Sequence, residues 1–301
     1  STRKAIQLQP DFAEAHSNLG NTLKDLGNLK EAELSTRKAI QLKPGFAEAH
    51  SNLGSILSDL GKLKEAELST RKAITLKPDF ADAYLNLSFI ELLKGNYKSG
   101  LENYEFRLKT KEPTISHGKA KIKQVNNEKV DKDEKLLVVS EQGLGDTLQY
   151  MRYIPYLRNQ GFDISFCAQT KLHSLIKASA IDSDPLTIEQ ANQVSKGQWI
   201  PLLSLPKYLK ITPKNPIISE PYIYVTDELK KKWKNILSEE KKPIIGINWQ
   251  GNPNAEKNYQ KNRSFPLETF SILTKNNNFK FLSLQKGFGS EQFDHCSFKS
   301  K

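Results

Sequence analysis

The stretch Lys135–Tyr153, KLLVVSEQGLGDTLQYMRY, predicts a strand, a glycine turn and the start of a helix. Leu136–Ser140 is a short apolar run rich in β-branched residues, which is typical of a buried parallel strand. Gly143 and Gly145 follow in a predicted tight turn, and from Thr147 onward apolar residues recur at helical spacing. This order is the first unit of a doubly wound α/β domain, whose ligands bind beyond the carboxyl ends of the strands.

Asp146 lies at that edge of the predicted sheet, beside the N–H groups of a helix start. Two interpretations are open: an N-cap, a position that Asp often takes, and a catalytic base that faces the crevice. The common phosphate-binding signatures are missing, because Leu148 stands where G-x-G-x-x-G needs its third glycine and no Gly-Lys-Ser/Thr loop is present. The turn is therefore a weak signal for NAD and speaks against a P-loop NTPase.

The 301 residues, 37% of them hydrophobic, are enough for two or three soluble domains. No run approaches the length of a membrane span, and the N-terminus has no apolar signal region. Cys167 and Cys296 form neither a disulfide framework nor a metal site, which favours a reducing cytoplasm. The net charge is +11, but no nucleic-acid motif accompanies it, so we expect a solvated basic surface and no nucleic-acid partner.

Outward from this stretch, the N-terminal part consists of repeats. Residues 1–34 and 35–68 align without a gap and differ at six positions, and a third copy begins at Ser69. A period of 34 with two predicted helices per unit is typical of the tetratricopeptide repeat (TPR). Small Gly20 and Ala32 would let the paired helices approach closely. We therefore predict a TPR α-solenoid over residues 1–112, of three helix pairs behind a partial leading helix.

The repeats resemble those of O-GlcNAc transferases. The motif AEAHSNLG stands at residues 13–20 and 47–54, and the second helix ends in RKAIQLKP at residues 37–44. In that family an asparagine of the first helix forms a ladder on the concave face that binds extended peptides. The matching residues here are Asn18, Asn52 and Asn86, which implies a peptide or protein partner. The alternative is that asparagine is a common solvated residue of this repeat.

The rest of the chain is predicted to form a linker and two α/β blocks, each of which begins with a β-strand. A polar linker is predicted over residues 113–134, a first Rossmann-like lobe over 135–222, and the start of a second lobe over 223–301. A segment with spaced prolines, residues 213–221, ends the first block. The predicted strands are 136–140, 163–167, 199–205 (strand or loop), 243–248 and 279–284, with helices at 171–179, 227–237 and 267–276.

A second resemblance rests on the order of EQGLGDTLQYMRY, LLSLP, IGINWQGNP, NRSFPLETF and FLSLQKG. This order is similar to heptosyltransferase-like glycosyltransferases, most of all to bacterial proteins that fuse TPRs to such a domain. The resemblance implies a two-lobed GT-B fold, with the acceptor on the first lobe and a nucleotide-sugar substrate on the second. It implies no cofactor and no metal. Asp146 matches the general base, and Arg263 matches a basic residue that holds the donor diphosphate.

Further donor-binding candidates follow the strands of the second block, where the backbone must come close to a nucleotide. They are Gln250, Gly251 and Asn252 after one strand, and Gln285 and Lys286 after the next. The 59 residues from Pro243 onward hold about one βαβ unit, roughly half of a complete lobe, and the family's later donor motif is absent.

We therefore predict an incomplete second lobe, with residues 288–301 poorly packed and the chain a fragment at both ends. Two functions remain open, a glycosyltransferase or a piece of one, and a non-catalytic TPR scaffold with a degenerate α/β domain.

Overall fold

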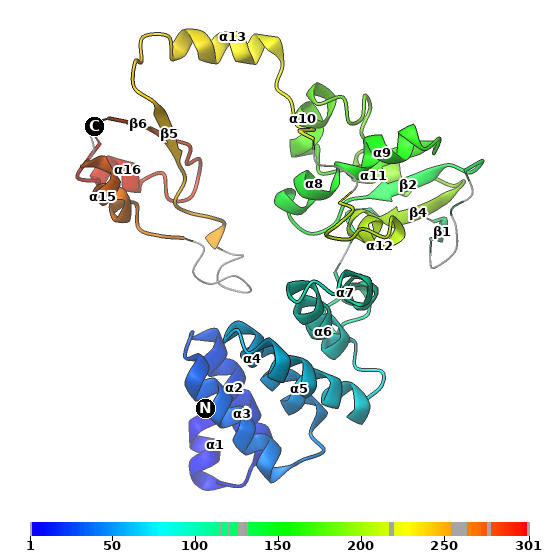
Figure 1. Ribbon diagram of the computed structural model, residues 1–301, viewed down its shortest axis with the longest axis vertical. Helices are drawn as coiled ribbons and strands as arrows, with labels where there is room; N and C mark the ends of the chain where they lie inside the picture. The colour runs from blue at the N-terminus through cyan, green and yellow to red at the C-terminus, as the bar shows by residue number, and fades with distance from the viewer. Residues whose placement is uncertain are drawn as a thin grey trace. The chain divides into compact units, whose positions relative to one another are not determined.

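The computed structural model in Figure 1 divides into two compact units, Ser1–Val225 and Thr226–Lys301. The division falls three residues after the predicted boundary between the two α/β blocks. The structure describes residues 2–114, 116–118, 121–125, 130, 132–216, 220–253, 264–275 and 278–299.

The N-terminal part of the first unit is helical and follows the 34-residue period. Within residues 2–104 three helix pairs follow a leading helix, as predicted. The helices are α1 (Thr2–Leu8), α2 (Ala13–Asp25), α3 (Leu29–Leu42), α4 (Ala47–Asp59), α5 (Leu63–Leu76), α6 (Ala81–Leu93) and α7 (Tyr97–Tyr104). A glycine in the left-handed region separates the helices of each pair, at Gly27, Gly61 and Gly95.

Small residues let the helices of a pair cross closely. Ala66 and Ala73 of α5 are completely buried, and a Cβ built on Gly54 of α4 would lie 2.0 Å from Thr70 Oγ1. Gly20 stands in the same relation to Thr36 one repeat earlier. The close approach that the small residues predict is therefore present.

The last repeat departs from the other two and packs onto the α/β part of the unit. Helix α7 ends at Tyr104, and a 3-10 helix, η1 (Glu105–Leu108), continues the chain. The Phe106 ring stacks on Tyr84 of α6, with centroids 4.1 Å apart and an interplanar angle of 9°. Tyr104 packs against the hydrophobic core of the α/β part. This contact covers the end of the solenoid, as expected from the apolar residues of the third repeat.

The α/β part of the first unit is built on a parallel sheet with the strand order β1-β4-β2-β3. The residues of β2 are all buried, with Leu136 and Val138 in one apolar cluster and Leu137 and Val139 in another. Both faces of the sheet are therefore covered, as a doubly wound sheet requires. The strands are β1 (Lys123–Gln124), β2 (Leu136–Val139), β3 (Ile164–Cys167) and β4 (Gln198–Pro201).

Short helices follow these strands. They are α8 (Leu144–Tyr150), α9 (Tyr153–Asn159), α10 (His173–Ala178), α11 (Ile188–Asn192) and α12 (Leu205–Tyr208), with 3-10 turns η2 (Thr170–Leu172) and η3 (Leu202–Ser204). The helix predicted from Thr147 begins at Leu144 instead, because Gly143 has extended backbone and serves as the N-cap. Asp146 therefore lies inside the first turn of α8.

The second unit holds two parallel strands among its described residues, β5 (Ile244–Ile247) and β6 (Lys280–Ser283), with Ile244 opposite Lys280. Its helices are α13 (Asp227–Ile236), η4 (Leu267–Phe270), α15 (Ser271–Thr274) and α16 (Gln292–His295). Trp249 and Phe298 are buried in one cluster with Ile247 and Leu267. The expectation that residues 288–301 pack poorly is thus wrong for Phe298, because an aromatic side chain from after α16 completes this small core. Phe288 is 60% exposed.

Among the described residues, no helix has both the length and the apolar character that crossing a bilayer requires.

Candidate functional site

The asparagines predicted to bind peptide occupy one position on three successive first helices, Asn18 on α2, Asn52 on α4 and Asn86 on α6. The Asn52 Nδ2 donates to Ser17 Oγ at 3.0 Å, and the Asn86 amide donates in the same way to Ser51. One N–H of each amide thus binds the previous repeat and fixes its orientation. Within the described part of the chain, the carbonyl oxygen and the second N–H of these two amides make no other hydrogen bond and can bind a ligand. That this row faces a concave groove stays a prediction.

The glycine turn between β2 and α8 holds Asp146. Its Oδ2 accepts the backbone N–H of Gly143 at 3.0 Å, so Asp146 is not the N-cap that one interpretation predicts but the third residue of α8, whose side chain binds back to the N-cap Gly143. Its other oxygen, Oδ1, accepts no hydrogen bond from the described part of the chain. Gln142 has a φ of 60°, a left-handed conformation that a side chain rarely adopts and that often marks a functional turn. The Asp146 side chain is half-buried.

Arg107 of η1 joins the last repeat to this turn through a buried ion pair. Its Nη2 lies 2.7 Å from Glu141 Oε1 and its Nε lies 3.2 Å from Glu141 Oε2, a two-pronged contact. Arg107 is 1% exposed and Glu141 is 0% exposed. The guanidinium also donates to Glu105 at 2.8 Å and to Ser204 Oγ at 2.9 Å, and the Leu203 N–H donates to Glu141. The EQGLGD and LLSLP motifs thus meet around one cation.

Burial and the charges around Arg107 and Tyr104 shift the pKa values of both side chains. Burial opposes the charge of Arg107, but hydrogen bonding and attraction to Glu141 and then to Glu105 raise its pKa above the ordinary value. Burial also raises the pKa of Tyr104, and the nearby carboxylates of Glu141 and Asp146 add to this. The Tyr104 hydroxyl accepts a hydrogen bond from Gln142 Nε2 at 3.0 Å. Tyr104 is therefore a neutral phenol that links α7 to the glycine turn.

A second tie holds the turn to the neighbouring strand. Thr147 Oγ1 donates to Gln169 Oε1 at 2.8 Å, and Gln169 follows β3 directly after Ala168. Cys167 at the end of β3 is buried, and burial raises the pKa of its thiol to about 12. The thiol is therefore a packing group and not a nucleophile at neutral pH.

In the second unit, the loops after β5 and β6 are joined by amide side chains. Gln285 Oε1 accepts the backbone N–H groups of Trp249 and Gln250, at 3.2 and 3.0 Å. Its Nε2 donates to the carbonyls of Gln250 and Phe288. The Gln250 side chain accepts a hydrogen bond from Gln292 at 2.9 Å. Both amides are therefore engaged inside the unit, so their predicted contact with a nucleotide would require these bonds to change.

The remaining donor-binding candidates are Gly251, Asn252, Lys286 and Arg263, of which the structure describes the first three. Gly251 is exposed and donates its N–H to Ser264 Oγ at 3.0 Å, and Asn252 is also exposed. Lys286 is exposed and makes no hydrogen bond or ion pair with the described residues. Arg263 lies outside the residues that the structure describes. The structure thus brings Gln250 and Gln285 together, and their role toward a nucleotide-sugar stays a prediction.

The described residues contain no cluster of three or more His, Cys, Asp or Glu side chains that could hold a metal ion. Sequence reasoning missed the network of Arg107, Glu105 and Ser204. Its only sequence signal was Glu141, a charged residue placed directly after an apolar strand.

Two matches to family models define the class of the helical part. Residues 13–46 and residues 47–80 each match the family model of the tetratricopeptide repeat. The chain therefore contains TPRs, a repeat that suggests protein or peptide binding, as the 34-residue period predicts. No curated protein matches the chain.

Solved structures also resemble the chain over about a third of its length. A crystal structure of MamA shares 29% identity, with 36% of this chain and 64% of that chain covered and a TM-score of 0.33. YrrB, titled a TPR protein with an unusual peptide-binding site, shares 22%, with 37% and 58% covered and a TM-score of 0.34. The TPR2B domain of yeast Sti1, in complex with pHsp70, shares 26%, with 31% and 75% covered and a TM-score of 0.30. The chain spans less than two thirds of the length of MamA and YrrB.

Proposed function

We propose that this chain is part of a glycosyltransferase that modifies a protein or peptide. In this proposal the TPRs bind the polypeptide, and the glycine turn presents Asp146 to the acceptor hydroxyl. The observation that carries the proposal is the buried contact between Arg107 and Glu141, because it joins the last repeat rigidly to the turn that holds Asp146. A rigid joint turns binding on the repeats into proximity at the turn.

The chemistry of the turn supports a role in transfer. A sugar or serine hydroxyl is a poor nucleophile, and a carboxylate that accepts its proton helps by roughly 10²–10⁴-fold. Asp146 uses one oxygen to cap α8 and has the other free within the described chain. The same carboxylate can therefore be held in place and act as a base. A nucleotide-sugar is the proposed donor, with the loops after β5 and β6 on the donor side.

The test is Asp146→Asn, assayed by nucleotide release from UDP-, GDP-, ADP- and CMP-sugars in the presence of a peptide library. The amide keeps an oxygen for the Gly143 N–H, so the thermal midpoint should be unchanged while turnover falls by about 10²-fold or more. Asp163→Asn is the matched control, because Asp163 is an exposed carboxylate of the same unit. Turnover of the Asp146 variant within a few-fold of the wild type would remove Asp146 from the mechanism.

A non-catalytic TPR scaffold is the second candidate. Two observations favour it: Asp146 caps a helix, and the side chains of Gln250 and Gln285 are engaged inside their unit. Calorimetric titration with UDP, GDP, ADP and CMP separates the candidates. A chain that binds peptides but none of these nucleotides, and releases none from the sugars, is a scaffold.

A further inference from the structure

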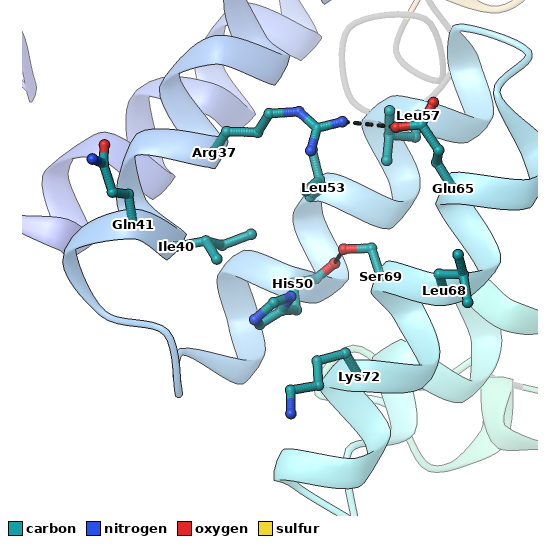
Figure 2. A pocket seen from close by; sticks show the side chains of 10 residues that line it. All are labelled: Arg37, Ile40, Gln41, His50, Leu53, Leu57, Glu65, Leu68, Ser69 and Lys72. Atoms are coloured by element: carbon teal, nitrogen blue, oxygen red, sulfur yellow. Dashed lines mark hydrogen bonds and ion pairs between the residues drawn. The ribbon is translucent and has the colours of Figure 1, made fainter.

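A hollow of about 520 Å³ opens among the helices α3, α4 and α5. Figure 2 shows Arg37 reaching from α3 towards Glu65 at one end, with the side chains of His50 and Lys72 near the other. The lining residues include none of the asparagines of the first helices. The hollow is therefore a site separate from the amide row, and the proposal below does not depend on the glycosyltransferase function.

The walls of the hollow are apolar. Of the cations that line it, Arg37 has an acidic partner among the described residues and Lys72 has none. Leu53 and Leu57 are buried in one cluster with Ile40 against it, and Leu68 on the rim is 71% exposed. Arg37 is bound by Glu65 at 2.9 Å, which closes one end. The ammonium of Lys72 makes no hydrogen bond or ion pair with any described residue. The hollow therefore offers apolar surface together with one cation free for a ligand.

The repeat itself supplies a filled version of the same place, because residue 50 plus 34 is Tyr84 and residue 72 plus 34 is Phe106. In the last repeat these two rings stack with centroids 4.1 Å apart. Where the earlier repeat has His50 and Lys72, the last repeat thus fills the space with its own aromatic pair.

A carboxylate occupies the other end of the filled copy. Glu91, the counterpart of Leu57, accepts from Arg71 at 2.7 Å and from Asn103 at 2.8 Å. Arg71 is the counterpart of Arg37, and Asn103 is the counterpart of Ser69, so this carboxylate marks the Arg37 end of the site and not the aromatic end. In the open hollow the ring must come from another polypeptide, and the ammonium of Lys72 can bind a carboxylate of the same polypeptide.

We propose that the hollow among α3, α4 and α5 binds a partner protein through an aromatic side chain next to an acidic residue. The ring lies on the imidazole of His50, beside the stem of Lys72, which stands at the position of Phe106. The neighbouring carboxylate binds the ammonium of Lys72. Burial of one aromatic ring against Ile40 and the stem of Lys72 supplies the apolar part of the affinity.

The test uses the whole chain and the probe acetyl-Asp-(4-fluoro-Phe)-Asp-amide, observed by the ¹⁹F line width in a titration. The decisive variant is His50→Tyr with Lys72→Phe, which rebuilds the filled pair of the last repeat inside the hollow. We expect the probe to bind the wild type and to lose at least about tenfold in affinity with this variant. Circular dichroism should report unchanged helix content, because the chain already accepts this pair at 84 and 106.

Two further variants keep the test decisive. Leu68→Glu places a carboxylate on the exposed rim, with no core contact to lose, and should weaken the probe as well. Lys64→Ala is the matched control, because Lys64 is another exposed lysine of α5 that does not line the hollow, and it should leave the affinity within about twofold.

Three results would overturn the proposal. They are no binding of the probe to the wild type at millimolar concentration, equal binding to the filled variant, or loss of binding with Lys64→Ala alone. Equal binding of acetyl-Lys-(4-fluoro-Phe)-Lys-amide would overturn the acidic part of the partner's chemistry.

Discussion

Arg107 carries a positive charge into the interior of the first unit, where two carboxylates and a hydroxyl surround it. Taking these charges out of water is expensive, and the cost is repaid only because nearly every donor of the guanidinium finds an acceptor. A buried pair of this kind is weak evidence for added stability. It does specify which surface of the last repeat meets the glycine turn, since any other register would leave Glu141 buried and unpaired.

The first prediction is that Arg107→Met destabilises the first unit by about 3–5 kcal/mol, because Glu141 then stays buried without a cation. Hydrogen exchange of the β2 and α8 amides, together with urea unfolding, measures the loss. Arg37→Met is the matched control, since Arg37 also binds two glutamates but at the surface, where the loss should stay below about 1 kcal/mol. Adding Glu141→Gln to Arg107→Met should recover part of the stability. Equal losses for the two arginine variants would show that the buried network does not organise the joint.

At the scale of elements, the repeats depend on two kinds of contact that recur in successive repeats. One is the glycine–threonine crossing within a pair, at Gly54 and Thr70. The other is an ion pair from a glutamate of a second helix to a lysine at a helix end in the next repeat. Glu33 of α3 binds Lys62, the N-cap of α5, at 2.8 Å, and Glu67 of α5 binds Lys94, the C-cap of α6. The crossing sets the distance between the helices of one pair, and the ion pair ties one repeat to the next.

A substitution at the crossing tests how tightly the two helices are packed. Gly54→Ala improves helix propensity by up to about 1 kcal/mol, but its Cβ would clash with Thr70 Oγ1. We expect overpacking to win and to destabilise the repeats by about 1–3 kcal/mol. Thr70→Ala in the same chain removes the clashing hydroxyl, so the double variant should be more stable than the sum of the two single changes predicts. Additive losses in thermal unfolding would contradict this explanation.

The ion pairs predict a loss of stability in acid. The hydrogen bond from Lys94 lowers the pKa of Glu67, and although partial burial opposes this, Arg71 lowers it further. Because the folded pKa lies below the unfolded value of about 4.3, the contribution is fully present above that value and is lost as the pH falls through the folded pKa.

Glu67→Gln should therefore lower the denaturation midpoint at pH 7 and cost progressively less as the pH falls toward 3. Glu31→Gln is the control, since Glu31 is exposed and has no partner among the described residues. A deficit of the Glu67 variant that is the same at both pH values would rule out this linkage.

For the whole molecule, the division into two units at Val225 and Thr226 matters most. The first unit joins the repeats to the parallel sheet through buried contacts. The second begins with α13, a helix of Asp227–Ile236 in which no residue is buried. Local unfolding costs least where few apolar side chains are buried.

Limited digestion with trypsin should therefore cut first within α13, at Lys230–Lys234, and leave a stable fragment that holds the first unit. Mass spectrometry of the early fragments measures this. Exposed lysines of the repeats, such as Lys38 on α3, are the internal control, because they lie on helices with buried alanines and should be cut later. Early cleavage inside α3 would contradict the expected order of stability.

The periodic parts of this protein could be predicted from the sequence alone. The repeats, the β2 strand and the glycine turn follow from patterns within a few residues of one another, and local patterns restrict the backbone locally. The boundary of α8 was less accurate, because Gly143 has no side chain that marks it as an N-cap. Asp146 is not the N-cap that one interpretation predicts, and its role as a catalytic base stays a prediction, since its bond to Gly143 uses only Oδ2.

Only the tertiary structure decided which charged residues are internal. Arg107 binds Glu141, 34 positions later in the chain, and Ser204, 97 positions later. No local sequence pattern joins residues that are so far apart. From the sequence alone, Arg107 would be predicted to lie on the surface, as most arginines do. The sequence likewise gives no sign that Tyr84 and Phe106 stack. Their two rings fill a space in the last repeat, and the corresponding space is open in the repeat before it. The sequence gives the chemical type of each residue. Its burial depends on which distant segments pack against it, and burial determines whether a charged or polar group is solvated, paired or reactive.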